Sequence, residues 1–284
     1  MGDFASLCVM KQLAGRTAIL TGASGGLGSH LVHALASEQI NLLLVAYPGV
    51  ELPRVQAVAA KETVRAEVLV ADLRVAAERT RVIESALRDF GHVDLLINNA
   101  GVEYSWAYHE LTASQIAEVI AVNLEAPMLL SWQLLPHLLK RGTGHIVNIS
   151  SLAGKAGPGF QEPYAATKAG LVGFTQSLRA SYRGTGVSAS VVTPGFIEAG
   201  IYTRLKETTG RAAPALLGAC PPERVCQAVI RAIREDRPEL IVNRYPVRPI
   251  LALSALFPRF GEWFNRSIGV TDFFRRAAEL NRRP

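Results

Sequence analysis

Short apolar runs that alternate with longer helical patterns restrict the fold of this chain more than any other feature. The apolar runs lie at residues 16–20, 41–46, 67–70, 95–98, 145–149, 187–193 and 240–242. Helical patterns lie at 25–38, 50–60, 76–90, 112–124, 126–141, within 162–182, and at 222–235. Crossovers of this length join parallel strands, and strands without polar alternation are buried on both faces. The sequence therefore predicts an α/β fold with a doubly wound, seven-stranded parallel sheet.

The length and charge of the chain indicate how this fold is organised. Hydrophobic residues make up 49% of the 284 residues, enough for one large core. No linker divides residues 10–243, so we expect a single domain there, followed by a helical C-terminal extension at 244–284. The extension contains eight arginines and three acidic residues, and thus five of the six net positive charges. The nearly neutral remainder argues against nucleic acid as a partner.

The cysteines indicate the compartment and argue against a metal site. Cys8, Cys220 and Cys226 are odd in number, and their spacing matches no metal-binding pattern. The chain does not open with the charged and apolar regions of a secretory signal. We therefore expect free thiols, no bound metal and a reducing, cytoplasmic location.

A glycine-rich turn, TGASGGLG at 21–28, connects the first predicted strand to a helix. Its glycines have the spacing G-x-x-x-G-x-G, at Gly22, Gly26 and Gly28. Glycines permit a tight turn and bring backbone N–H groups close to a pyrophosphate, whose charge the helix N-terminus stabilises. An ordinary connection could share this composition, but the strand before it and the helix after it favour a dinucleotide site.

Other polar motifs also follow predicted strands, where a doubly wound sheet binds its ligands. Asp72 follows the third strand and could accept a hydrogen bond from an adenine amino group, or cap a helix. The motif NNAG at 98–101 follows the fourth strand, and its small residues suit a wall against a cofactor.

Tyr164 and Lys168 form the strongest candidate for proton chemistry. They are four residues apart and so share one face of a helix. A nearby ammonium lowers the pKa of a phenol, and we expect Lys168 to do this for Tyr164. Ser151 stands thirteen residues before Tyr164, after the fifth strand. Such a tyrosine can act as a general acid and base.

Together these motifs resemble the classical short-chain dehydrogenase/reductase family. The residues that carry the resemblance are TGASGGLG at 21–28, Ala71-Asp72-Leu73, NNAG at 98–101, Asn123, Ser151, Tyr164, Lys168 and Pro194-Gly195. The resemblance implies a single-domain Rossmann fold. It also implies NAD(P)-dependent interconversion of a ketone and a secondary alcohol by hydride transfer.

The resemblance assigns roles to individual residues. Tyr164 would exchange the proton with the substrate oxygen, and Lys168 would lower the pKa of Tyr164 and hold the nicotinamide ribose. Ser151 would orient the substrate oxygen, and Asn123 would support a water chain. The implied cofactor contacts are Gly22, Ser24, Gly25, Gly26, Leu27, Gly28, Ala46, Tyr47, Asp72, Leu73, Asn99, Ala100, Gly101, Tyr164, Lys168, Pro194, Gly195 and Ile197.

The residues after the second strand bear on the choice of cofactor. Relatives that use NAD have an acid there, and those that use NADP have a basic residue nearby. Here Ala46 and Tyr47 provide neither charge, and Gly25 takes the loop position that is often basic. Without an acid to repel the extra phosphate, we predict NADP over NAD.

Two segments could shape the substrate site. Residues 197–221 correspond to a substrate lid in relatives, and their apolar side chains fit either a hydrophobic carbonyl or alcohol substrate, or ordinary packing. The extension interleaves aromatic residues with arginines. Residues 246–284 could therefore touch a membrane surface peripherally, line the pocket, or join copies of the chain in a homodimer or homotetramer.

A second class of function is a non-catalytic NAD(P)-binding sensor or a membrane-associated scaffold with the same fold. A protein that only binds a nucleotide has no need of Ser151, Tyr164 and Lys168 together. The complete set therefore favours an enzyme.

Overall fold

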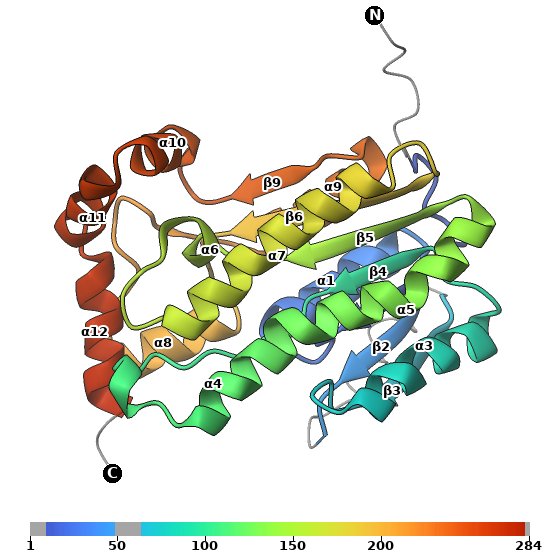
Figure 1. Ribbon diagram of the computed structural model, residues 1–284, viewed down its shortest axis with the longest axis horizontal. Helices are drawn as coiled ribbons and strands as arrows, with labels where there is room; N and C mark the ends of the chain where they lie inside the picture. The colour runs from blue at the N-terminus through green and yellow to red at the C-terminus, as the bar shows by residue number, and fades with distance from the viewer. Residues whose placement is uncertain (1–9, 49–63, 282–284) are drawn as a thin grey trace, which may run out of the picture.

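The computed structural model describes residues 10–48 and 64–281 (Figure 1). The helix expected at residues 50–60, and Cys8, lie outside the described residues. Seven strands form one parallel sheet in the order β3-β2-β1-β4-β5-β6-β9. Their bounds are β1 Thr17–Thr21, β2 Asn41–Ala46, β3 Ala66–Val70, β4 Leu95–Asn98, β5 Gly144–Ile149, β6 Val187–Pro194 and β9 Glu239–Val242. The predicted doubly wound Rossmann sheet is confirmed, and each strand end lies within one residue of its predicted position.

Helices cover both faces of the sheet, as its apolar strands require. In β1, Ala18 and Leu20 face one core cluster while Ile19, between them, faces the other. Residues of α1 (Gly26–Ser37) and α9 (Pro222–Glu235) belong to the first cluster. Residues of α3 (Ala76–Phe90) and α5 (Ala126–Arg141) belong to the second, and Leu178 of α7 (Glu162–Ser181) packs against it.

The two helices predicted at 112–124 and 126–141 are a single helix with a wider turn inside it. Thr112 and Gln115 form a capping box at the start of α4 (Ala113–Ile120). A π-helical turn, Ala121–Glu125, then leads directly into α5. Pro127 has no N–H to bond to the carbonyl of Asn123, so a standard turn is incomplete there. This helix is long and apolar enough to cross a membrane, but it packs on the sheet as a core helix does.

The segment at 197–221 contains structure that the sequence did not predict. β7 (Phe196–Ile197) pairs in parallel with β8 (Ala219–Cys220), and α8 (Ile201–Thr209) lies between them. Cys220 and Cys226 are buried, free thiols. The two short strands hold both ends of the segment at the carboxyl edge of β6.

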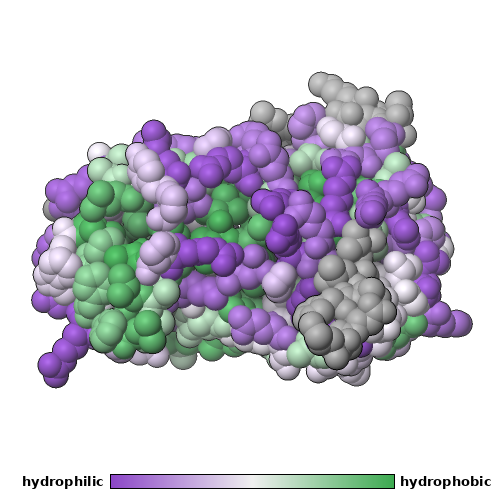
Figure 2. All heavy atoms as spheres, turned by 90° about the horizontal axis from the view of Figure 1, so that it is seen from above, coloured by the Kyte–Doolittle hydropathy of each residue, from purple (hydrophilic) through white to green (hydrophobic). Residues whose placement is uncertain are grey.

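The predicted helical C-terminal extension consists of three helices: α10 (Arg248–Leu256), α11 (Pro258–Ser267) and α12 (Val270–Asn281). They stack along one end of the molecule, on the left of Figure 1. Phe273 and Phe274 of α12 pack with Tyr202 and Leu205 of α8 in a third apolar cluster. Seen from above, hydrophobic side chains gather on the surface at this same end (Figure 2).

Candidate active site

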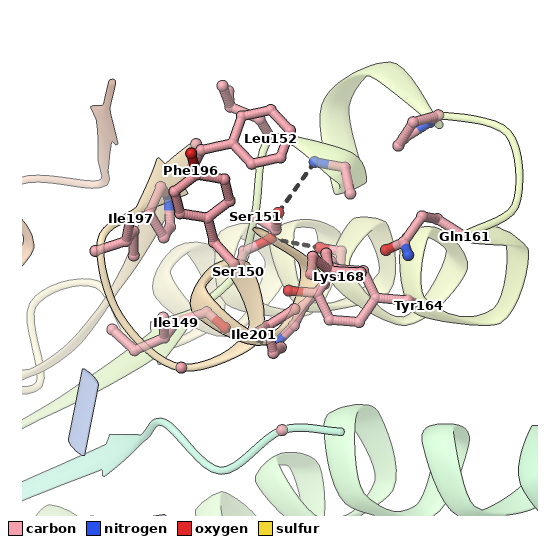
Figure 3. Close-up of a pocket in the computed structure, with 18 of the residues that line it drawn as sticks. Ile149, Ser150, Ser151, Leu152, Gln161, Tyr164, Lys168, Phe196, Ile197 and Ile201 are labelled. Atoms are coloured by element: carbon pink, nitrogen blue, oxygen red, sulfur yellow. Dashed lines mark hydrogen bonds between the residues drawn. The ribbon is translucent and has the colours of Figure 1, made fainter. Parts of the chain in front are cut away.

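A cavity of about 490 Å³ opens beside the carboxyl ends of β1, β4, β5 and β6. The stick view shows Tyr164, Ser151 and Lys168 on one wall and Phe196, Ile197 and Leu152 nearby (Figure 3). Of the predicted site residues, those that line the cavity are Gly22, Gly25, Gly26, Leu27, Gly28, Asn99, Ala100, Gly101, Ser151, Tyr164, Lys168, Pro194, Gly195 and Ile197. Motifs far apart in the sequence thus meet around one space.

The glycine turn is packed too closely for other residues. A Cβ on Gly28 would lie 2.0 Å from the carbonyl oxygen of Gly22, which itself has a φ of +65°. The amide of Asn99 donates to the carbonyls of Thr21 (3.0 Å) and Gly22 (3.1 Å), so the NNAG segment holds the turn. Gly25 is the N-cap of α1, and the first turn of α1 contains no acidic residue that would repel a phosphate. This cradle of backbone at a helix N-terminus fits the pyrophosphate of a dinucleotide.

Lys168 is held deep in the wall behind Tyr164. Only 4% of it is exposed, and its Nζ donates to the carbonyl oxygen of Ile149 at 2.9 Å. The same nitrogen lies 5.6 Å from the centre of the Tyr164 ring. The hydroxyl of Ser150 donates to the Lys168 carbonyl at 2.7 Å, so Ser150 fixes α7. The side chain of Ser151, which stands thirteen residues before Tyr164, forms a hydrogen bond with that tyrosine.

The pKa of Tyr164 differs from the expectation drawn from the sequence. Burial raises it to about 12, the hydrogen bond with Ser151 lowers it, and the charge of Glu103 raises it. Burial lowers the pKa of Lys168 to about 8. Loss of solvation therefore dominates the pKa of Tyr164, and the expected lowering of that pKa by Lys168 stays a prediction.

Asn123 lies in the π-helical turn, fully buried behind the cavity. Its side-chain amide donates to the carbonyl of Val102 at 2.9 Å, and its oxygen accepts from the Val102 N–H at 2.8 Å. The amide also donates to the Thr167 hydroxyl at 3.4 Å. Asn123 thus joins the segment after β4 to α7, and its part in a water chain stays a prediction.

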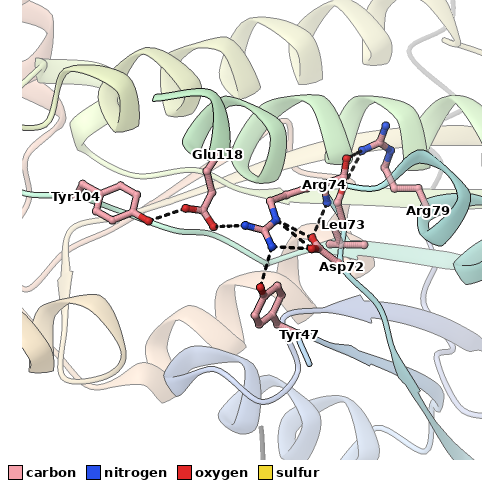
Figure 4. Close-up of polar contacts among 7 residues, drawn as sticks. All are labelled: Tyr47, Asp72, Leu73, Arg74, Arg79, Tyr104 and Glu118. Atoms are coloured by element: carbon pink, nitrogen blue, oxygen red, sulfur yellow. Dashed lines mark hydrogen bonds and ion pairs between the residues drawn. The ribbon is translucent and has the colours of Figure 1, made fainter. Parts of the chain in front are cut away.

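An arginine that the sequence reasoning missed organises the polar groups after β2 and β3 (Figure 4). Arg74 Nε donates to both oxygens of Asp72, at 2.9 and 3.0 Å. Its Nη2 donates to the Tyr47 hydroxyl at 2.8 Å, and its Nη1 donates to Glu118 at 2.9 Å. Glu118 accepts in turn from Tyr104 at 2.6 Å. The sequence signal that could have indicated this contact is the position of Arg74, two residues after Asp72.

The remaining predicted cofactor contacts lie away from the cavity lining. They are Ser24, Ala46, Tyr47, Asp72 and Leu73. Ala46 and Leu73 are buried, whereas 52% of Tyr47 is exposed beside Arg74. Tyr47 and Asp72 therefore share a second, polar region at the ends of β2 and β3, next to the glycine turn that follows β1.

The far wall of the cavity is apolar and comes largely from segments beyond the motifs. Phe196, Tyr202 and Leu205 contribute from β7 and α8. Leu251 and Phe274 contribute from the C-terminal extension. Of the three roles considered for the extension, a pocket wall is the one that this lining supports.

A polar group that the sequence did not indicate also lies beside Tyr164. Gln161 lines the cavity, is 2% exposed, and donates to Glu103 and to the Ser105 hydroxyl. Burial raises the pKa of Glu103, while its hydrogen bonds and Arg204 lower it. Glu103 follows the NNAG motif directly after Val102, without a recognisable pattern of its own.

The model of the short chain dehydrogenase family matches residues 16–210, more than half of the chain. The chain belongs to the short-chain dehydrogenase family. This short-chain dehydrogenase is 36% identical to the ketoacyl reductase HetN of Nostoc sp., over 95% of each chain. It is 30% identical to the D-beta-hydroxybutyrate dehydrogenase of Cupriavidus necator, over 66% of this chain and 72% of that one. As a member of this family, it is an NAD(P)-dependent oxidoreductase that acts on CH–OH and C=O groups.

A solved structure is similar in fold. Levodione reductase superposes with a TM-score of 0.74 at 24% identity, over 81% of this short-chain dehydrogenase and 96% of that chain. The match to HetN reaches further along the chain than the family model does, and includes most of the C-terminal extension. The extension therefore accompanies the Rossmann domain in at least one relative.

Proposed function

We propose that this short-chain dehydrogenase interconverts a ketone and a secondary alcohol on a hydrophobic molecule, such as a ketoacyl chain, a steroid or a polyketide-like compound. One observation carries the proposal: Tyr164 and Ser151 share a cavity with apolar side chains of β7, α8, α10 and α12. Apolar walls stabilise an apolar substrate, while the few polar groups select the orientation of its oxygen. The similarity to a ketoacyl reductase favours the first of these substrates.

The catalytic roles follow from the positions of three side chains. Ser151 and Tyr164 would both donate hydrogen bonds to the carbonyl oxygen of the substrate. In reduction, the Tyr164 hydroxyl gives its proton to that oxygen, and in oxidation the phenolate takes the proton from the alcohol. Lys168 would bind the nicotinamide ribose with the hydrogens that Ile149 does not use. The nicotinamide, when bound, supplies or accepts the hydride.

We also propose NADP as the preferred cofactor. The missing acid after β2 supports this choice, and so does Arg74, whose guanidinium contacts the Tyr47 hydroxyl. Arg74 is already paired with Asp72 and Glu118, but the N–H that contacts the neutral Tyr47 hydroxyl can donate to a phosphate instead. In this proposal the ribose phosphate takes the place of the Tyr47 hydroxyl on Arg74, and the glycine turn holds the pyrophosphate.

The proposed assembly is a cytoplasmic homodimer or homotetramer. Exposed apolar side chains on α5 support it, because 40% of Met128 and 68% of Trp132 are in contact with solvent. They lie four residues apart and thus on one helix face. Large exposed apolar residues that are neighbours on one surface are typical of contacts between subunits.

Replacement of Tyr164 by Phe tests the proposed reaction. Loss of the general acid should lower kcat by about 10²- to 10⁴-fold, while cofactor affinity stays within about twofold. The measurement is reduced nicotinamide absorbance on a panel of ketones, with a fluorescence titration of the cofactor. Tyr108→Phe, an exposed tyrosine, is the matched control and should leave both unchanged. Full turnover by Tyr164→Phe would rule out the assignment.

A further inference from the structure

The outer surface of α10 and α11 is apolar although it faces solvent (Figure 2). We call it the hairpin surface, and define it by Leu253, Leu256, Phe257 and Trp263. Their exposed fractions are 44%, 73%, 59% and 60%. Residues 249–258 contain no charged side chain. A soluble surface seldom places this many large apolar residues side by side, so the hairpin surface requires a partner.

The opposite side of the same two helices faces the cavity. Ile250, Leu251 and Ser254 of α10 line it, as do Phe264 and Asn265 of α11. The same two helices therefore border the substrate cavity on one side and solvent on the other. A helix that is apolar on both sides is ordinarily buried on both, and here the inner side alone is covered.

The charges around the hairpin surface indicate what covers it. Arg248, Arg259 and Arg266 are exposed on α10 and α11, with Glu262 as the acidic residue of these two helices. A second copy of the chain, placed on the same surface, would bring its own arginines against these, and like charges would repel. An anionic surface would instead attract them. Exposed tryptophan, phenylalanine and leucine flanked by arginine are typical of helices that lie in a membrane interface.

We propose that the hairpin surface docks on an anionic lipid membrane and places the substrate cavity next to the lipid. Leu256, Phe257 and Trp263 would enter the boundary between headgroups and acyl chains, and the arginines would bind lipid phosphates. Docking does not depend on the proposed reaction. The delivery of an apolar substrate from the membrane does rest on it.

Binding to vesicles tests the docking. The full-length protein should co-sediment with phosphatidylcholine vesicles that contain phosphatidylglycerol, and much less with phosphatidylcholine alone. The fluorescence of Trp263 should shift to shorter wavelength on binding, and Trp263→Phe should abolish that shift. The double variant Leu256→Glu/Phe257→Glu should bind the anionic vesicles at least about tenfold more weakly than the unchanged protein, because two apolar side chains no longer enter the interface.

The control places a charge on an exposed apolar residue elsewhere. Val75→Glu, at the start of α3, should bind vesicles as the unchanged protein does. Both positions of the double variant are exposed, and its thermal unfolding should match that of the unchanged protein. Absence of co-sedimentation with anionic vesicles, together with an unshifted Trp263 emission, would overturn the proposal. So would a double variant that binds normally.

Two further outcomes separate this proposal from others. In one outcome, the unchanged protein does not bind vesicles, and the double variant has a different sedimentation coefficient in solution from the unchanged protein. The hairpin surface then joins copies of the chain, and the proposal is wrong. Tyr164→Phe should bind vesicles normally. If the unchanged protein binds vesicles but turns over none of the ketones tested, the proposed reaction is refuted and the proposed docking still stands.

Discussion

The environment of Tyr164 explains why its proton is hard to remove. Burial raises its pKa to about 12, and the charge of Glu103 adds to this. The protonated phenol, which reduction requires, is thus abundant across the neutral range. The phenolate that oxidation requires becomes abundant only in alkaline solution. We expect the oxidation rate to rise with pH where the reduction rate is still level.

Replacement of Glu103 by Gln tests this electrostatic coupling. The neutral amide no longer destabilises the phenolate, so the pKa of Tyr164 falls. The rise of kcat/KM for alcohol oxidation should begin at lower pH than in the unchanged protein. The measurement is the pH profile of oxidation at saturating cofactor. Glu84→Gln, exposed on α3, provides the control, and superimposable profiles for Glu103→Gln would contradict the coupling.

Arg74 is the residue at which the cofactor preference can be measured. We expect Arg74→Gln to lower kcat/KM for NADPH about tenfold or more, because a charged hydrogen bond to the phosphate is lost. The kcat/KM for NADH should change by less than about threefold, since NADH lacks that phosphate. Initial rates with both cofactors give the ratio of kcat/KM for NADPH to kcat/KM for NADH. Arg88→Gln, at the far end of α3, should leave the ratio unchanged, and an unchanged ratio in Arg74→Gln would exclude the arginine as a phosphate ligand.

The sequence predicted the residues around the cavity better than the residues behind them. Gly22, Ser151 and Tyr164 stand in motifs whose spacing reflects local backbone geometry, and they line the cavity together. Arg74 and Glu103 also contact side chains far away in the sequence, Glu118 in α4 and Gln161 just before α7. No local spacing encodes such contacts. The shift in the pKa of Tyr164 was unpredictable for the same reason, since burial depends on the whole fold.

At the scale of elements, the strands were predictable because each is a continuous apolar run between two layers of helices. The sequence predicted a break between α4 and α5 at the right place, but it predicted that one helix ends there and another begins. Glu125 and Ala126 keep helical backbone angles there, and the chain widens into a π-helical turn. Asn123 in this turn contacts Thr167 of α7, and a pattern read along one segment cannot include such a contact.

The glycine turn before α1 makes a prediction at this scale. A methyl group on Gly28 would overlap the Gly22 carbonyl, so Gly28→Ala must displace the backbone that forms the cofactor cradle. We expect cofactor affinity to fall at least about tenfold, and the free energy of unfolding to fall by about 1–3 kcal/mol. Fluorescence titration and urea unfolding measure the two effects.

The matched control is Gly173→Ala in α7, where a Cβ would meet open space. Alanine favours a helix over glycine, so this variant should be as stable as the unchanged protein or more so by up to about 1 kcal/mol. Normal cofactor affinity in Gly28→Ala would mean that the turn does not hold the pyrophosphate.

For the whole molecule, the exposed face of α5 predicts the assembly. Sedimentation velocity should give the mass of two or four chains. Trp132→Glu should shift the equilibrium toward a single chain, because a buried charge at a contact between subunits is strongly unfavourable. His137→Glu, exposed near the end of the same helix, serves as the control. A protein that sediments as one chain without any substitution would contradict the prediction.

The packing of α8 against α12 has a consequence for turnover. Tyr202 and Leu205 of α8 pack with Phe273 and Phe274 of α12, so the segment over the cavity and the last helix share one apolar cluster. Parting them would expose these rings to water. We therefore expect α8 and α12 to swing together as a rigid body on the left-handed glycines Gly200, Gly210 and Gly269. Product release would then be a collective motion that slows in viscous solvent.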